Sequence, residues 1–587
     1  MNHLYLSSIK EVKKNMKQKR TELKRPKFTK KYTLPFILIT LAVILSLSLG
    51  TVSAADWTVG PGGTYNYTSI QDAIDNESTI SGDTINVYDN GGTPYTYNEN
   101  VVVNKTNLTL RSTGQVTVDG SSSPANSVFT VFNTGAGANI IGFILTGATS
   151  SAGVNIPTSD SVTLTNLTIN NCQMGVLIMG TSNNITVESA TINTPTQQGI
   201  YISEEAIVTN LTITGTPSNP TTITNAGASA IQKNSLSDTC GINITNTIIT
   251  NPTSYGILLE SAHRSWGRDY YLTNVQINNT QVTGATSDGI RIIMTTIGSE
   301  NVIIQNTSIT NSNNIGMNLQ TRGTLNLENN TLTHNGYNGG DAGFWGLYLI
   351  GDNNNNITIT PDNKFYRNRN GAFLQNVGQE TNPINFDGTL IVDNAGYPIW
   401  IRNGRYITIT DAIFDDVTTQ AATGFRIQRA ITIDGNNNIN ITLTNLTINQ
   451  TTQQGIYIGD DATITNLTIN NTQINETGAN SIEKHPLSDI YGINITNTTI
   501  TNPQGHGINL PDGHRSWGRD YILNNVQINN TQVTGATQTG IIITMNMGNS
   551  QNATITNTNA TNNQQHGIYL QTRGTLNLEN NTLTHNG

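Results

Sequence analysis

The sequence has little cysteine, little charge and few aromatic residues. It contains 2 cysteines, Cys172 and Cys240, among 587 residues, of which 11% are charged and 6% aromatic. The two cysteines are separated by more than two of the repeats described below, or about 10 Å along a stack of strands. A disulfide needs Cα atoms within about 7 Å of each other. We therefore expect both thiols to be unpaired.

Positive charge is concentrated in one short segment. Eleven of the 29 basic residues lie between Lys10 and Lys31, whereas 18 basic and 36 acidic residues follow from Ala55 onward. Nucleic-acid binding depends on basic patches, so this balance argues against a nucleic-acid partner. Low charge does not indicate disorder here, because Ile, Val and Thr alternate regularly with polar residues.

One short phrase recurs along the chain: Asn-x-Thr-Ile-x-Asn, a polar gap, and Gly-Ile-x-Ile. It is clear at 166–178 and 191–202, and its halves return at 455–458, 466–469 and 567–570. The alternation of apolar and polar residues is typical of strands with one buried face. The glycines recur at intervals of about 24 to 30 residues, and the unit has no helical pattern. The repeat therefore predicts a β-helix solenoid.

The first 54 residues are interpreted as a basic region followed by an export signal. An uncharged apolar run, Leu34–Leu49, is followed by small residues that end in a possible cleavage site after Ala54. The alternative is an uncleaved membrane anchor through residues 34–54, because the run approaches spanning length. In both cases the positive-inside rule places residues from 55 onward outside the cytoplasm.

The N-terminal end of the β-helix is predicted to carry a cap. Residues 55–112 are assigned to the cap and first coils, and residues 113–587 to the β-helix proper. Tyr67–Asp75 is the one convincing soluble helix, with hydroxyl residues at its start and apolar residues on one face. A short amphipathic helix at this place would cover the open end of the first coil.

This end of the chain resembles the right-handed parallel β-helix proteins of the pectin-lyase-like superfamily. The resemblance is carried by Trp57–Gly63, the Ser-Ile-Gln-x-Ala-Ile helix, Gly82–Ile85 and Asn98–Val103. With its Asn/Thr-rich coils and export signal, the chain also resembles the adhesin-like surface proteins of methanogenic archaea. The resemblance covers residues 56–587 and implies an all-β fold: a single-stranded right-handed parallel β-helix solenoid with a short N-terminal capping helix. It leaves activity open, because the superfamily holds lyases, hydrolases, esterases and non-enzymatic adhesins.

A larger duplication lies within the β-helix, and equivalent residues in the C-terminal part of its two copies are 251 positions apart. The octapeptide His263–Tyr270 returns as His514–Tyr521, and a segment of about 162–336 returns as 439–587. The segment 337–438 between the two copies is not duplicated and is richer in aromatic residues.

The coils are expected to form a long rod. Roughly twenty coils fit the sequence, and at about 4.8 Å each they would span on the order of 100 Å. Asn pairs in the turns, at 183–184, 355–356 and 437–438, predict amide ladders along the axis. The chain stops at Gly587, whereas its equivalent Gly336 continues into another coil. We expect that the sequence continues beyond this point or that another chain covers this end.

The enzymatic alternative is a polysaccharide lyase or glycoside hydrolase of the same fold. Gly505-His506-Gly507 resembles a polygalacturonase motif, but His506 occupies the slot before the recurring glycine, where the first copy has Tyr255. The nearest paired acids in the sequence lie about two coils away, whereas acid–base catalysis needs groups within reach of one bond.

Two pairs of acids, at 204–205 and 460–461, are interpreted as solvated turns. A calcium site would need further acids at ligand spacing, and the sequence around these pairs has none. We assign no catalytic residue, no metal ligand and no cofactor from the sequence.

The repeated octapeptide is the densest polar and aromatic cluster in the chain. It does not have a strand pattern, so we expect two loops that project from the rod. Trp and Tyr faces stack on sugar rings, and Arg and Asp bond hydroxyl groups. The alternative is that each Trp pins its loop to the coil below. The candidate glycan-binding residues are His263, Arg264, Trp266, Arg268, Asp269, Tyr270, His514, Arg515, Trp517, Arg519, Asp520 and Tyr521.

Asn-x-Ser/Thr sequons are frequent, and in an exported protein they are glycosylation acceptors. Candidate acceptors are Asn107, Asn166, Asn210, Asn243, Asn440, Asn494 and Asn580.

The sequence as a whole predicts an exported, cell-surface, adhesin-like β-helix rod. Its expected partners are extracellular glycans or other cells, and its expected contact with a membrane is limited to residues 34–54. A polysaccharide-degrading enzyme of the same fold remains the alternative.

Overall fold

The computed structural model describes residues 54–263, 267–337, 343–352, 356–388, 391–392, 394–415, 426–516 and 518–587. The predicted export signal lies outside these residues, apart from Ala54. In the described part, no helix is long and apolar enough to cross a membrane. Residues Ala54–Gly587 form one compact unit.

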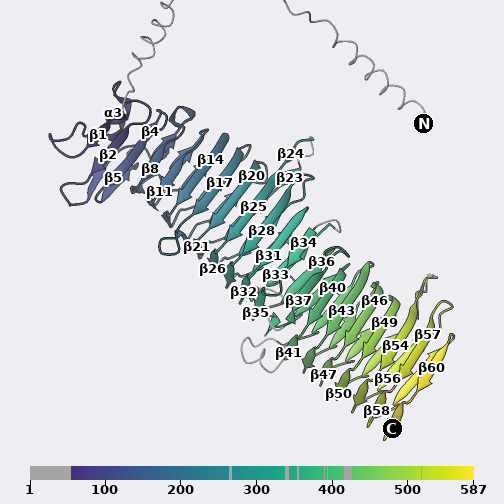
Figure 1. Ribbon diagram of the computed structural model, residues 1–587. Helices are drawn as coiled ribbons and strands as arrows, with labels where there is room; N and C mark the ends of the chain where they lie inside the picture. The colour runs from purple at the N-terminus through teal and green to yellow at the C-terminus, as the bar shows by residue number, and fades with distance from the viewer. Residues whose placement is uncertain are drawn as a thin grey trace, which may run out of the picture. The chain divides into compact units, whose positions relative to one another are not determined.

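This unit is a right-handed parallel β-helix, as the sequence predicted (Figure 1). Each coil contributes one strand to a continuous stack that we call sheet 1, in which every neighbouring pair is parallel. The strands of sheet 1 are β4 (Val101–Val103), β7 (Phe129–Val131), β10 (Ala152–Ile156), β13 (Met174–Ile178), β16 (Ile200–Ile202), β19 (Ile231–Lys233), β22 (Ile257–Glu260), β27 (Ile290–Ile293), β30 (Met317–Gln320), β33 (Leu347–Ile350), β36 (Ala372–Gln375), β39 (Ile399–Arg402), β42 (Ile431–Asp434), β45 (Ile456–Ile458), β48 (Ile482–Lys484), β51 (Ile508–Pro511), β56 (Ile541–Met545) and β59 (Ile568–Thr572).

The two other faces of the coil are each divided into two stacks. Among the described residues, sheet 2 runs from β1 (Asp56–Val59) to β34 (Asn356–Ile359) and again from β37 (Ile384–Asp387) to β60 (Leu576–Glu579). Sheet 3 runs from β3 (Tyr95–Tyr97) to β38 (Ile391–Val392) and again from β41 (Ile413–Asp415) to β61 (Thr582–Thr584). Both divisions fall in the unduplicated segment 337–438, where sheet 1 continues without a break.

The core lies inside the coils and runs along the rod. In β16, Ile200 and Ile202 are buried, and Tyr201 between them faces outward. The same alternation along the chain builds one core cluster from Val59 to Ile555. Each fully buried aliphatic side chain contributes roughly 1.5–3 kcal/mol, so the solenoid is stabilised coil by coil. Cys172 and Cys240 are unpaired, which confirms the prediction.

The recurring glycine marks a place where adjacent coils leave no room for a side chain. A Cβ atom added at Gly256 would lie 2.4 Å from the backbone oxygen of Gly289 and 2.4 Å from the side chain of Val282. Gly175, Gly199 and Gly289 face similar contacts with the next coil. The close stacking of the coils therefore explains why glycine recurs at this position of the repeat.

We predict that Gly256→Val lowers stability, because the added atoms would force the backbone of the next coil outward. Overpacking of this kind costs about 1–3 kcal/mol. Thermal unfolding would measure the loss against the control Gly548→Val, because a Cβ at Gly548 meets nothing within 4 Å. Equal stabilities of the two variants would contradict the stacking explanation.

The N-terminal capping helix is confirmed but is shorter than predicted. Helix α3 (Ile70–Asp75) starts three residues after Tyr67, because Ser69 is extended and caps the helix. The Ser69 hydroxyl accepts a hydrogen bond from the Asp72 backbone N at 3.2 Å. The buried face of α3 packs at the first coils.

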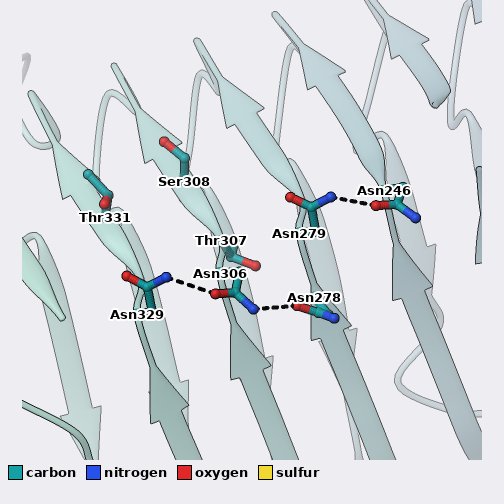
Figure 2. A pocket seen from close by; sticks show the side chains of 8 residues that line it. All are labelled: Asn246, Asn278, Asn279, Asn306, Thr307, Ser308, Asn329 and Thr331. Atoms are coloured by element: carbon teal, nitrogen blue, oxygen red, sulfur yellow. Dashed lines mark hydrogen bonds between the residues drawn. The ribbon is translucent and has the colours of Figure 1, made fainter. Parts of the chain in front are cut away.

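Asparagine ladders follow the corners of the coil, as Figure 2 shows for one groove. The Asn306 Nδ2 donates to Asn278 Oδ1 at 2.9 Å, and the Asn329 Nδ2 donates to Asn306 Oδ1 at 2.8 Å. Asn279 bonds to Asn246 in the same way. Asn279, Asn306 and Asn329 have φ near +50°, a conformation that Asn tolerates better than most residues. The amides and hydroxyls line an open groove of about 580 Å³, which is a consequence of the ladder.

The predicted ladders are partly confirmed. The Asn210 Nδ2 donates to Asn184 Oδ1 at 2.9 Å, as expected for the pair at 183–184. Asn438 is instead buried, and its amide bonds backbone groups, including the Gly404 N at 2.9 Å. Asn355 lies outside the described residues.

Candidate functional site

The two copies of the octapeptide form short β-hairpins on the rod. In the first copy, β23 (Ala262–His263) pairs antiparallel with β24 (Asp269–Tyr270), and in the second β52 (Gly513–His514) pairs with β53 (Asp520–Tyr521). The prediction of a projecting loop without strands was therefore wrong in this detail. In each hairpin a histidine is hydrogen-bonded to the aspartate of the opposite strand. His263 Nδ1 lies 2.5 Å from Asp269 Oδ1, and His514 Nδ1 lies 2.8 Å from Asp520 Oδ1.

The first hairpin is clamped to acids of the two preceding coils. The Arg268 guanidinium donates to Glu205 and to Asp238, each at 3.1 Å. The buried Tyr270 hydroxyl donates to Glu205 at 2.6 Å. The hydrogen bond to Asp238 raises the pKa of Arg268. The polar groups predicted to bind a glycan are thus engaged in holding the hairpin on the rod.

The second hairpin uses equivalent contacts. Arg519 donates to Asp489 at 2.9 Å, and the Tyr521 hydroxyl donates to Asp461 at 2.9 Å. Arg515 donates to Asp461 at 3.0 Å and to Asp460 at 3.3 Å.

The paired acids are therefore more than solvated turns. They supply the counter-charges of the two hairpins, over 54 to 65 residues of sequence. Of the twelve predicted residues, the structure brings His263, Arg268, Asp269 and Tyr270 together in one hairpin and His514, Arg515, Arg519, Asp520 and Tyr521 in the other. Arg264, Trp266 and Trp517 lie outside the described residues.

The seven candidate glycosylation sites differ in their surroundings. Asn107, Asn166, Asn210 and Asn580 are exposed, whereas Asn243, Asn440 and Asn494 are half-buried. Asn243 lies within β20 (Asp238–Thr245) and Asn494 within β49 (Asp489–Thr496). The Asn210 Nδ2 is used in a ladder, whereas Asn166 takes part in its ladder through Oδ1, which accepts from Asn219 at 3.0 Å.

We predict that glycan occupancy in the exported protein is higher at Asn166 than at Asn243 and Asn494. An acceptor must offer its side chain to the transferase, and the side-chain oxygens of Asn243 and Asn494 are buried, whereas Asn166 is exposed. Mass spectrometry of intact glycopeptides would measure the occupancies. Higher occupancy at Asn243 and Asn494 than at Asn166 would contradict this ranking.

Sequence reasoning missed a cluster on the outer face of sheet 1, which we call the aromatic strip. Tyr348, Phe373 and Trp400 face outward from β33, β36 and β39 and are direct neighbours in the register of the sheet. Tyr348 and Phe373 stack with centroids 4.7 Å apart and planes 9° apart. Trp345 and Tyr397 complete the strip, with ring centroids 6.1 Å and 5.2 Å from that of Trp400.

The strip forms a cluster separate from the core inside the coils. Trp345 is 1% exposed and packs under Phe373 and Trp400, whereas Tyr348, Tyr397 and Trp400 are half-buried. The indole N–H groups of Trp345 and Trp400 have no hydrogen-bond partner among the described residues. The strip therefore consists of rings packed on one another, together with two buried indole donors that have no hydrogen-bond partner among the described residues.

Ion pairs flank the strip at both ends. Arg402 is bound bidentately by Asp434, with Nε–Oδ1 at 2.9 Å and Nη2–Oδ2 at 2.7 Å, and its guanidinium lies 5.5 Å from the Trp400 ring centroid. At the other end, the Arg291 Nε donates to Glu260 at 2.8 Å, and its Nη1 lies 3.6 Å from Asp288. Burial raises the pKa of Asp288 despite hydrogen bonds from Asn318 and Ile315.

The second copy of the repeat lacks this polar end of the strip. The positions of Glu260, Asp288, Arg291 and Asn318 are occupied there by Pro511, Thr539, Ile542 and Tyr569. The adjacent inward residues Ile290 and Ile292 return as Ile541 and Ile543. Outward side chains therefore differ between copies in which the core residues are the same.

The Gly505-His506-Gly507 motif belongs to the scaffold. The His506 Nδ1 accepts a hydrogen bond from the Thr539 backbone N at 3.1 Å, and burial lowers the pKa of the imidazole. In the described part of the chain, no group of three His, Cys, Asp or Glu residues could hold a metal ion.

Comparison with known proteins identifies the family. A family profile described as "Right handed beta helix region" matches residues 235–414, 345–516 and 429–587, which together are more than half of the chain. The chain belongs to the right-handed beta helix family. This right-handed beta helix protein is also similar, over residues 76–251, to a family described as "Periplasmic copper-binding protein (NosD)". No curated protein matches it.

Several solved structures are similar to this right-handed beta helix protein at low scores. An alginate lyase from Paenibacillus sp. str. FPU-7 is 14% identical, with a TM-score of 0.29 over 53% of this chain and 94% of that one. The tailspike of E. coli bacteriophage HK620 in complex with a pentasaccharide is 9% identical, with a TM-score of 0.34 over 69% and 71%. The catalytic domain of a GH87 alpha-1,3-glucanase in complex with nigerose is 12% identical, with a TM-score of 0.26 over 75% and 68%. Scores of this size support no argument about activity.

Proposed function

We propose that this protein is an exported, adhesin-like rod that binds extracellular glycans on the outer face of sheet 1. The observation that carries the proposal is the aromatic strip, in which Tyr348, Phe373 and Trp400 stand in register on consecutive coils. Aromatic rings with a polar group at one end suit ligands that are apolar on one face and wet on the other, as sugar rings are.

Export is supported by two features. The apolar run behind the basic N-terminal segment has the pattern of an export signal. The similarity to a periplasmic family over residues 76–251 agrees with a location outside the cytoplasm. Copper is not part of the proposal, because that segment contains no histidine.

The hairpins have a different role in this proposal from the one that the sequence predicted. Their Arg and Tyr side chains bind acids of neighbouring coils, so their described residues serve to fix the hairpins on the rod.

One observation favours a second candidate, a polysaccharide-cleaving enzyme. Glu260 and Asp288 both lie at Arg291 beside the strip, and a carboxyl with a raised pKa is what a general acid requires. Against this, Asp288 is 3% exposed and both of its oxygens accept hydrogen bonds, from the Ile315 N at 3.2 Å and the Asn318 Nδ2 at 2.9 Å. These contacts indicate that Asp288 has a structural role, in which it links its own coil to the next one.

The experiment that separates the two candidates is a glycan array followed by a product assay on every glycan bound. We expect binding without new reducing ends or unsaturated products. Turnover that disappears in Asp288→Asn would replace the binding function by the enzymatic one. Absence of binding to any glycan would refute the proposal.

A further inference from the structure

An asparagine ladder follows a bend within the strands of sheet 2. The Asn210 Nδ2 donates to Asn184 Oδ1 of the preceding coil at 2.9 Å. Further along the rod, the Asn301 Nδ2 donates to Asn274 Oδ1 of its preceding coil at 3.0 Å. In each case the amide nitrogen points to the preceding coil and the amide oxygen accepts from the next one. A regular ladder therefore uses both ends of every amide.

The ladder is interrupted at Gly241, which lies between Asn210 and Asn274 in the register of three neighbouring strands (Figure 1). A Cβ atom added at Gly241 would lie 2.8 Å from Asn210 Oδ1, so this oxygen faces the place where the ladder lacks an amide. No donor among the described residues bonds to it. From the other side, the Asn274 Nδ2 meets only the sulfur of Cys240, at 3.7 Å. The gap therefore presents one free acceptor and one weakly bonded donor.

The second copy of the repeat has the same interruption. Gly492 lies between Asn466 and Asn525, and a Cβ atom there would lie 2.9 Å from Asn466 Oδ1. Asn525 Oδ1 accepts from the Asn552 Nδ2 at 3.1 Å, whereas the Asn525 Nδ2 has no partner in the described part of the chain. Each gap opens into a surface groove, of about 360 Å³ at Gly241 and about 280 Å³ at Gly492.

One amide group of a ligand fits each gap. Neighbouring coils lie about 4.8 Å apart, so the two asparagines that flank a gap are about 10 Å apart along the axis and leave room for a single amide. A trans secondary amide carries its N–H and its C=O on opposite sides. It can therefore donate to the oxygen on one side of the gap and accept from the nitrogen on the other. The flanking residues Asn210, Asn274, Asn466 and Asn525 are exposed, so a ligand can reach these atoms.

The surroundings of the gaps favour an amide that hangs from a sugar ring. The residue before the glycine is Cys240 in the first copy and Tyr491 in the second, and both side chains are exposed. A thiol is a small apolar surface for a methyl group, and a tyrosine ring suits a sugar, which is apolar on one face and polar on the other. A peptide chain would bring several amides in succession, whereas the positions beside each gap are already filled by asparagine.

We infer that the gaps at Gly241 and Gly492 each bind the acetamido group of an N-acetylhexosamine, whose amide completes the asparagine ladder. This inference goes beyond the proposed function, because it concerns sheet 2 and not the aromatic strip. In the first gap the amide N–H donates to Asn210 Oδ1, the carbonyl oxygen accepts from the Asn274 Nδ2, and the methyl group lies against Cys240.

The reactivity of Cys240 tests the inference at the first gap. Its thiol is exposed, whereas Cys172 is buried and should not react in the folded protein. We expect the methyl glycoside of N-acetylglucosamine to slow the reaction of the full chain with an aromatic disulfide reagent about threefold or more at saturation, because the bound sugar covers the sulfur. The methyl glycosides of glucose and glucosamine, which lack the amide, should leave the rate unchanged.

Two variants test whether the ladder atoms hold the sugar. Asn274→Ala removes the donor and should raise the sugar concentration needed for half-protection about fivefold. Gly241→Asn supplies the missing amide from the protein itself, at a φ of +83° that Asn tolerates, and should abolish the effect of the sugar. The matched control Asn329→Ala removes an amide from the ladder of Figure 2, and it should respond to the sugar like the wild type.

The outcomes also separate the inference from the proposed function. A rate that does not change with N-acetylglucosamine, or that falls equally with glucose, would overturn the inference and leave the aromatic strip untouched. Stronger protection by N-acetylglycine N-methylamide would assign the gap to a peptide and would overturn it as well. Protection that survives unchanged in Asn274→Ala and Gly241→Asn would place the sugar elsewhere, with the same consequence. Protection that survives in the double variant Tyr348→Ala, Trp400→Ala is expected, since the strip is a separate site.

Discussion

Replacing Lys233 and Lys484 together by Met is expected to remove the rise in stability that we predict for the wild-type protein between about pH 7 and about pH 8.5. The two lysines occupy equivalent positions in the two copies of the repeat and point into the coil, where they are 1% and 0% exposed. Their strand neighbours at this position include Ile202, Leu259 and Ile458. Each lysine is thus a basic group whose neighbours at the same position of the adjacent strands are aliphatic.

The lysine ammonium groups are held by backbone carbonyls. The Lys233 Nζ donates to Glu260 O at 2.7 Å and to Asn234 O at 3.0 Å, and the Lys484 Nζ donates to Pro511 O at 2.7 Å and to His485 O at 3.1 Å. Burial lowers the pKa of each lysine to about 7, although nearby acids oppose the shift.

The sign of the pH dependence follows from these values. In the unfolded chain a lysine keeps its proton up to the ordinary pKa of 10.5, whereas in the folded protein it loses the proton above about pH 7. Between these values the unfolded state binds more protons, so the free energy of unfolding rises with pH. Below about pH 7 both states are protonated, and the cost of burying the charge is fully present.

The expected slope is on the order of 1 kcal/mol per pH unit for each lysine. Denaturant unfolding at several pH values would measure it, with each single Met variant as an intermediate case. The window avoids the half-buried histidine His506, whose pKa burial lowers from 6.5, and Cys172, whose pKa burial raises from 9.0 to about 11. A double Met variant with the same slope as the wild type would show that the lysines do not titrate in this range.

Trp345→Ala is expected to cause the largest local loss of stability on the outer face. Trp345 is the largest fully buried side chain among the described residues, and its ring centroid lies 5.5 Å from that of Phe373 and 6.1 Å from that of Trp400. Removal of a buried Trp side chain costs about 3–5 kcal/mol. Since the cluster is separate from the main core, the loss should be confined to the coils of β33, β36 and β39.

Hydrogen exchange would show where this loss falls. We expect faster amide exchange in those three strands of Trp345→Ala and unchanged exchange in β13 and β16. Trp345→Phe is the matched control, since it keeps a ring and removes the unpaired N–H, and it should lose much less protection. Protection in Trp345→Ala equal to that of the wild type would contradict the view that this residue supports the strip.

The fold could be predicted from the sequence because the pattern that determines it is contained within each coil. The alternation of Ile with Thr and Asn gives each strand one buried face. The glycine recurs because in each coil a side chain at that position would clash with the next coil. Helix α3 was placed correctly except for its start, which the extended Ser69 sets. The amide ladder at Asn184 followed from the same repetition.

The candidate site could be predicted only in part, because it depends on the register between coils of unequal length. The sequence showed that the central segment is rich in aromatics, but not that Tyr348, Phe373 and Trp400 become neighbours, since 25 and 27 residues separate them. The partners of the hairpin residues were hidden for the same reason. Glu205 and Tyr270 are 65 residues apart in sequence and within hydrogen-bond distance in the fold.

The most direct test of glycan binding by the aromatic strip is a titration of the best array glycan into the double variant Tyr348→Ala, Trp400→Ala. The matched control is Tyr569→Ala, which removes an exposed tyrosine from the same outward file of sheet 1 in the second copy. Aromatic anchors contribute about 2 kcal/mol each, so the double variant should lose roughly a thousandfold in affinity and the control should bind like the wild type. Wild-type affinity in the double variant, with the fold intact by circular dichroism, would contradict the account.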